Sequence, residues 1–203
     1  MTKFLRILPV GLLVGLLVFA PKANAFYSPL GVAIIPPVQF PSSDYSVSGL
    51  RASVLWGDHR DVYGLDLGVI GNMTEQRFVG IGISGIFNLT KGDTTIILAQ
   101  VAGLANLNVQ KTNIYGIQAA IGINKNDAES KLVGIGVALA NLSPNMDVYG
   151  LQVGAYNVSR SVYGLQLGLI NQTTNLHGLQ IGLLNFALNG GPFKVSPILN
   201  FGF

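Results

Sequence analysis

A short glycine-containing motif that repeats nine times constrains this chain more than any other feature. Its clearest copies are YGLQVGAYN at 149–157, YGLQLGLIN at 163–171 and HGLQIGLLN at 177–185. Weaker copies begin at positions 48, 63, 79, 97, 115 and 133, and the first glycine positions of successive copies are 14 to 18 residues apart. Such an internal repeat indicates an array of equivalent structural units rather than an irregular globule.

Residues alternate within each motif with a period of two. In the 163–171 copy, Leu165 and Leu167 point to one face and Gly164 and Gln166 to the other. A helix would place two glycines in its interior in every copy, at a cost of about 1 kcal/mol each relative to alanine. The motifs therefore predict about ten short strands, separated by polar turns such as 125–130.

Two all-β architectures fit this alternation. The first is an antiparallel transmembrane β-barrel of about ten strands, within a range of eight to twelve, with short turns; its leucines would face lipid and its glycines and glutamines the interior. The alternative is a soluble β-solenoid with the leucines as its core and the Gly/Gln face in water. The variable spacing favours the barrel, because hairpins tolerate it better than coils of fixed circumference.

Aromatic residues also favour the barrel. Four motifs begin with tyrosine, at Tyr63, Tyr115, Tyr149 and Tyr163. In antiparallel strands this position would fall alternately at the two ends and form both interfacial aromatic girdles. The chain ends on Phe201 and Phe203, and a last strand that ends in an aromatic residue is typical of outer-membrane barrels, in which it closes against the first strand.

Residues 1–25 have the pattern of a removable signal peptide. A basic start is followed by the apolar run 7–20 and by Ala23-Asn24-Ala25, which fits the small-x-small cleavage rule. The mature domain is therefore predicted to be 26–203, with nine strand repeats and a C-terminal strand. Its nine Lys and Arg balance nine Asp and Glu, so no basic patch is expected to bind nucleic acid.

Several segments together resemble the bacterial surface-repeat outer-membrane proteins. They are the GLQLGLIN-type units, IPPVQFP at 35–41, GLR at 49–51 and PILNFGF at 197–203. The resemblance spans roughly 30–203 and implies a small outer-membrane β-barrel of porin-like or unassigned role. A looser likeness, of architecture alone, is to oligomeric porin-like proteins that enclose a patch of lipid.

The motif position two residues after the first glycine is expected to line the interior of the barrel. It is glutamine in most copies but Arg51 and Asp66 in the first two, and these charges are expected to form a salt bridge because an isolated buried charge is costly. The alternative is that Arg51 and Asp66 both lie near a solvent-exposed rim and do not contact each other. The predicted lumen-facing residues are Arg51, Asp66, Gln118, Gln152, Gln166 and Gln180.

No catalytic, metal-binding or cofactor-binding constellation is recognisable. The chain has no cysteine and only two histidines, His59 and His177. The sequence therefore predicts a non-enzymatic protein of the Gram-negative outer membrane, structural or porin-like, with scope for an oligomer and a plugged or lipid-filled interior. Its predicted partners are outer-membrane lipid, further copies of itself, and the outer-membrane assembly machinery, which would recognise the C-terminal strand. The alternative is a secreted, soluble β-solenoid that serves adhesion or binding.

Overall fold

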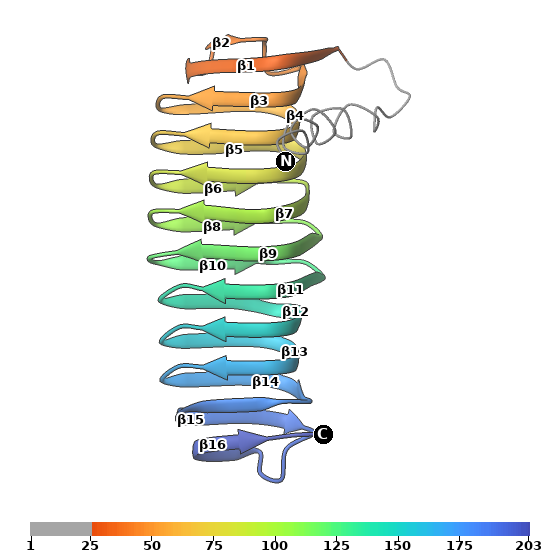
Figure 1. Ribbon diagram of the computed structural model, residues 1–203, viewed down its shortest axis with the longest axis vertical. Coiled ribbons are helices and arrows are strands. Elements are labelled where there is room, and N and C mark those ends of the chain that lie inside the picture. The colour runs from red at the N-terminus through yellow and green to blue at the C-terminus, as the bar shows by residue number, and fades with distance from the viewer. Residues whose placement is uncertain (1–25) are drawn as a thin grey trace, which may run out of the picture.

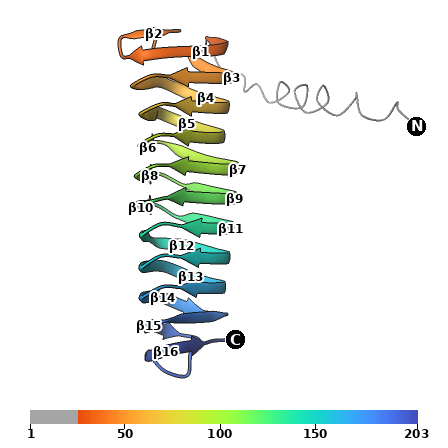
Figure 2. The same cartoon turned by 60° about the vertical axis from the view of Figure 1, so that its left-hand side comes forward.

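A computed structural model describes residues 26–203 and shows a β-solenoid of stacked coils (Figure 1). The predicted signal peptide lies outside the described residues. The turned view in Figure 2 shows that the coils stack almost straight. Within 26–203 the chain forms strands joined by turns and bends, which confirms the predicted all-β class. The strands do not form the predicted antiparallel barrel.

Sixteen strands join in a single sheet. They are β1 (Tyr27–Ile35), β2 (Val38–Phe40), β3 (Ser46–Ser53), β4 (Trp56–Gly68), β5 (Gly71–Ser84), β6 (Phe87–Thr90), β7 (Asp93–Ala102), β8 (Ala105–Asn108), β9 (Thr112–Ala120), β10 (Ile123–Asn126), β11 (Ser130–Val137), β12 (Ala140–Val153), β13 (Tyr156–Leu167), β14 (Ile170–Leu176), β15 (Leu179–Asn189) and β16 (Val195–Phe201).

Neighbouring coils pair in parallel, with equivalent motif positions side by side. Between β12 and β13, for example, Tyr149 pairs with Tyr163 and Gln152 with Gln166. Antiparallel pairing among the described strands is confined to the ends of the stack, where β2 pairs with β1 and β16 with β15. The path of paired strands ends at β2 and β16, which do not pair with each other. The predicted barrel, which would close the last strand on the first, is therefore wrong.

Each coil has a tight corner and a wide corner. In one coil, the end of β13 reaches the tight corner at Gly168 and Leu169, and β14 returns. The wide corner absorbs most of the variation in repeat length, since pairing registers shift there between His59 and Asp61 and between Ser143 and Asp147. Variable spacing therefore does not exclude a solenoid, because only the strands and the tight corner need a constant length.

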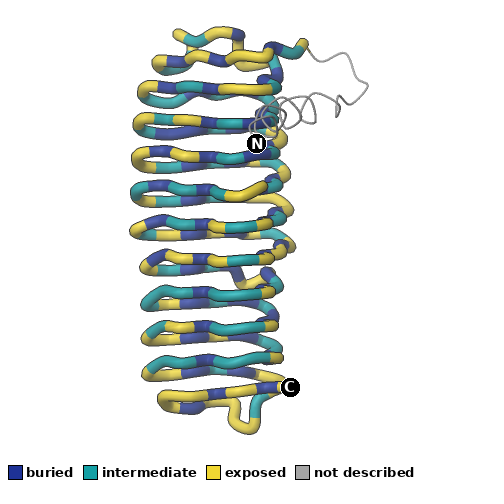
Figure 3. The backbone as a smooth tube through the Cα atoms, in the orientation of Figure 1, coloured by how far each residue is buried: buried dark blue, intermediate teal, exposed yellow. Residues whose placement is uncertain are grey.

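The glycine and glutamine face points inward and the leucine face outward. Gln166 is 0% exposed, whereas its neighbour Leu167 is 41% exposed. Figure 3 shows this alternation of buried and exposed positions along the coils. The solenoid alternative predicts leucines inside and the Gly/Gln face in water, and this orientation is wrong. Stacked amide side chains can fill an interior because they hydrogen-bond to one another.

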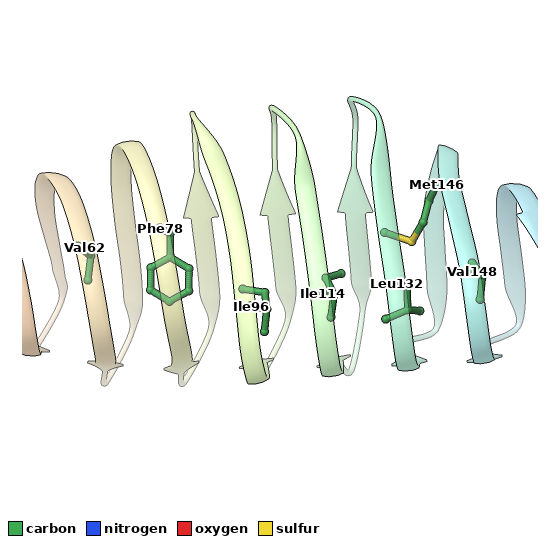
Figure 4. Packing of buried hydrophobic residues seen from close by; sticks show 7 residues of the cluster. All are labelled: Val62, Phe78, Ile96, Ile114, Leu132, Met146 and Val148. Atoms are coloured by element: carbon green, nitrogen blue, oxygen red, sulfur yellow. The ribbon is translucent and has the colours of Figure 1, made fainter. Parts of the chain in front are cut away.

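An apolar row supplements the polar interior. It stacks about one side chain per coil and lies close to the wide corner (Figure 4); its members are Val62, Phe78, Ile96, Ile114, Leu132, Met146 and Val148. Phe78 and Leu132 occupy coils in which glycine replaces the inward glutamine. A methyl group built on Gly136 would lie 3.2 Å from Leu132 Cδ2. Phe78 and Leu132 thus lie beside the space that the missing glutamines leave.

The first glycine of the motif, present in eight of the nine copies, lets the coils approach closely; the copy that begins at position 97 has Leu98 there, with a φ of +80°. Gly134 has a φ of +138°, a backbone conformation that residues with a side chain rarely adopt. A Cβ atom at this position would collide with the carbonyl oxygen of Gly116 in the preceding coil. At Gly134 the close approach of the coils therefore leaves no room for a side chain.

We expect Gly134→Ala to lower the free energy of unfolding by about 3 kcal/mol or more, because it combines backbone strain with a clash against main chain. Gly136→Ala, two residues further along the same strand, is the matched control. It meets only the flexible end of Leu132 and should cost about 1 kcal/mol or less. Urea unfolding followed by circular dichroism measures both, and equal losses would contradict the close-approach argument.

Candidate functional site

A continuous ladder of asparagines runs through the interior at the tight corner. Each Nδ2 donates to Oδ1 of the asparagine in the next coil, at 2.8 to 3.0 Å. The ladder members are Asn72, Asn88, Asn106, Asn124, Asn141, Asn157, Asn171 and Asn185. Amide ladders of this kind form when identical residues stack in register about 4.8 Å apart. The interior is therefore held together by side-chain hydrogen bonds as well as by the sheet.

Each ladder asparagine also fastens the tight corner. Asn124 Nδ2 donates to the carbonyl oxygen of Val137 at 3.0 Å, and Asn171 Nδ2 donates to that of Ile181 at 2.9 Å. These carbonyls belong to the strand that enters the next corner. Because a buried polar group needs a partner, asparagine supplies what the corner backbone lacks. In the sequence this asparagine marks the end of most motifs, and its recurrence from copy to copy is the signal that could have revealed the ladder.

The predicted inward glutamines are buried and form short ladders of their own. Gln166 Nε2 donates to Gln152 Oε1 at 2.7 Å, and Gln180 Nε2 donates to Gln166 Oε1 at 2.8 Å. Gln118 Nε2 donates to Gln100 Oε1 at 2.9 Å. These hydrogen bonds run in the opposite direction to those of the asparagine ladder. The glutamines therefore line a packed interior and not the lumen of a channel.

Replacing Asn124 by leucine, which is similar in size, should lower the free energy of unfolding by about 3 to 5 kcal/mol. The change leaves the buried oxygens of Val137 and Asn141 without their Asn124 donor and removes the acceptor of Asn106. The adjacent, outward-pointing Lys125→Ala is the control and should change stability by less than about 0.5 kcal/mol. Urea denaturation compares them; similar unfolding midpoints would mean that the ladder contributes little.

Arg51 and Asp66 lie in contact inside the first coils. Arg51 Nε donates to Asp66 Oδ1 and Nη2 to Oδ2, both at 2.7 Å, and the arginine is 0% exposed. Nη1 also donates to the carbonyl oxygen of Met73 at 2.6 Å, and Nη2 to Thr74 Oγ1 at 3.2 Å. This bidentate pair occupies the place of the glutamine ladder, and the guanidinium of Arg51 has further hydrogen-bond partners, which a buried charge requires.

His59 completes the polar cluster around Arg51. Its Nδ1 lies 3.4 Å from Arg51 Nη1, a donor, which assigns the proton to Nε2; this nitrogen donates to the carbonyl oxygen of Pro41 at 3.1 Å. Burial, and then the charge of Arg51, lower the pKa of His59 to about 4. An unfolded histidine binds a proton near pH 6.5, so the folded state loses stability as the pH falls from 6.5 toward 4. His59 is therefore a neutral core residue at pH 7.

Asp66→Asn should destabilise the protein by about 3 to 5 kcal/mol, because a buried guanidinium loses its counter-charge. Changing both Arg51→Gln and Asp66→Gln should recover a large part of that loss, since it restores the side chain used in other coils. A double-mutant cycle on urea unfolding, made of Arg51→Gln, Asp66→Gln and the double variant, measures the coupling energy. A coupling energy of zero would show that the pair contributes nothing as a pair.

The motif tyrosines lie in one row on one side of the stack. Tyr149 and Tyr163 stack with ring centroids 4.6 Å apart, and His177 continues the stack at 4.7 Å from Tyr163. In earlier coils Tyr63 pairs with Val79, and Tyr115 lies between Ile97 and Val133. The pairing register shifts between the coils of Val79 and Ile97. Parallel pairing brings equivalent positions together, so the predicted two girdles at opposite ends of the strands are wrong.

The C-terminal strand caps the solenoid. Phe201 pairs with Leu179 of β15 in the antiparallel ladder, and its ring lies 5.9 Å from that of Phe203. The strand therefore covers the last coil, and its recognition by an assembly machinery stays a prediction.

An apolar edge follows the tight corners. Eight of nine coils place a large aliphatic residue there that is 43% to 79% exposed, and the ninth has Ala155. We call these nine residues the apolar edge: Val54, Val69, Ile86, Leu104, Ile121, Leu139, Ala155, Leu169 and Leu183. Soluble monomers rarely expose contiguous apolar patches larger than a few hundred Å². A row of this length therefore indicates a contact surface.

Charged residues gather at the opposite, wide corners. Many pair there, as Arg160 Nε does with Asp147 Oδ1 at 2.8 Å and Lys91 Nζ with Glu75 Oε1 at 2.5 Å. Hydrogen bonding to Arg160 lowers the pKa of Asp147, and hydrogen bonding to Glu75 raises the pKa of Lys91. Apart from the buried Arg51–Asp66 pair, the charges within the described coils lie away from the apolar edge, so the solenoid is amphipathic across its width.

The interior has little space for a ligand. A space beside Asp66, Phe78 and Gly82 measures about 10 Å³, the room needed for one water molecule. Between residues 26 and 203, His, Asp and Glu side chains form no group of three that could hold a metal ion. The same part of the chain contains no helix with the length and apolarity needed to cross a membrane.

No family model, curated protein or solved structure matches the chain.

Proposed function

We propose that this protein is a non-enzymatic β-solenoid module of the bacterial envelope that acts through its outer surface, in binding or in structural support. The observation that carries the proposal is the division between interior and exterior. The interior is occupied by amide ladders, an ion pair and an apolar row, whereas the exterior presents a long apolar edge opposite a charged one. Chemistry at an interior site would need space that the ladders fill.

Two sequence features support placing this module at the outer membrane. The signal-peptide pattern of residues 1–25 favours export, and the repeat units resemble those of bacterial surface-repeat outer-membrane proteins. A stack of about nine coils spaced about 4.8 Å apart extends about 43 Å, which suits a spacer or an extended binding surface.

Expression of the full chain in a Gram-negative host tests the proposal. We expect export, a mature N-terminus at Phe26, recovery with the envelope, and labelling of wide-corner lysines such as Lys91 and Lys111 by an amine reagent that does not cross membranes. An Ala25→Leu variant, which breaks the small-x-small rule, should keep its leader. Full-length wild-type protein recovered unlabelled from the cytoplasm would overturn the proposal.

A further inference from the structure

We propose that the apolar edge rests in one leaflet of a lipid bilayer, with the solenoid axis parallel to the membrane plane and the charged corners in water. This inference deepens the proposed envelope role and rests on it. The partner is the acyl-chain region of a membrane.

The apolar surface extends beyond the corner residues. The outward positions of the strands that lead into each tight corner are also aliphatic, as at Ile135, Val137 and Leu167, which are each about 40% exposed. Small residues such as Ala138 and Gly154 form the floor of a shallow apolar groove between these strands and the corner row. The apolar surface is therefore wider than the corner row alone, and its shallow groove can accommodate acyl chains.

Aromatic side chains border this surface at a suitable distance. Tyr163 lies in β13, six residues before the corner residue Leu169, which corresponds to at most about 20 Å of extended chain. The hydrocarbon region of one leaflet is about 15 Å deep. With the strands tilted, the corner would lie among the acyl chains and the tyrosine row at the level of the headgroups, where tyrosine is favoured.

The regularity of the edge argues for lipid over a second copy of the chain. Successive coils present nearly the same aliphatic side chain about every 4.8 Å. A copy that slid by one coil would make almost the same contacts, so a protein interface built on this edge would have no defined register. A fluid layer of acyl chains needs no register and covers the edge equally well.

Charge placement predicts the character of the binding. No Lys, Arg, Asp or Glu lies within two residues of any apolar-edge position, and the basic and acidic residues of 26–203 are equal in number. Binding should therefore be driven by apolar burial, proceed on uncharged lipid and depend little on salt.

The single tryptophan provides a reporter. Trp56 lies two residues after Val54 at the tight corner of an early coil. The mature chain expected after removal of the signal peptide, 26–203, is the protein to purify. On titration with phosphatidylcholine vesicles, we expect tryptophan emission to shift to shorter wavelength, and lipids brominated on their acyl chains to quench it. The shift should persist in 0.5 M salt.

Matched triple variants locate the contact. Ile121→Gln, Leu139→Gln and Leu169→Gln together alter three exposed apolar-edge residues and should weaken vesicle partitioning at least tenfold. Lys91→Gln, Lys111→Gln and Lys125→Gln alter the same number of residues away from that edge and should leave partitioning within twofold. Circular dichroism verifies that each variant is folded.

Three results would overturn the inference. The first is no partitioning of the folded wild-type protein. The second is partitioning that salt or the lysine variant abolishes, which would indicate electrostatic attachment. The third is concentration-dependent self-association without lipid that the apolar-edge variant removes, which would show that a second copy covers the edge. A protein that is exported and retained at the envelope but does not partition leaves the proposed function standing and refutes only the lipid contact.

Discussion

The structure depends on one hydrogen bond repeated from coil to coil, between the side-chain amides of equivalent asparagines. The bond from Asn141 to Asn157, at 2.8 Å, exists only because parallel pairing places identical positions side by side. Each amide both donates and accepts along the stack, and such chains of hydrogen bonds polarise and strengthen one another. A buried amide without this neighbour would be destabilising, so the ladder both requires the parallel register and stabilises it.

The polar interior determines what the outside must be. Strand residues alternate between two faces, so once glutamines, asparagines and glycines occupy the inside, the leucines of the same strands lie outside. Their exposure is therefore a consequence of the core chemistry, and it creates a surface that needs covering. The apolar edge opposite the charged corners connects the buried ladders to the proposed role at a membrane.

Sequence reasoning could establish the strands, the repeat and the inward position of Arg51 and Asp66, because alternation reports faces directly. It could not establish the direction of pairing, because a period of two is the same in parallel and antiparallel strands. The discriminating signal was Asn157, Asn171 and Asn185, the same amide closing successive motifs, which is typical of stacked ladders. The side chains that surround His59 could not be predicted from the sequence either, because they come together only when the coils stack.

Disulfide trapping of motif tyrosines tests the parallel register most directly. The protein has no cysteine, so Tyr149→Cys combined with Tyr163→Cys gives one defined pair. These positions are direct partners in parallel strands, about 4.8 Å apart at Cα, within the range that a disulfide spans. We expect rapid intramolecular disulfide formation under mild oxidation in the folded protein. Two thiols that stay reduced, as an antiparallel arrangement with the positions about 25 Å apart would require, would contradict the solenoid.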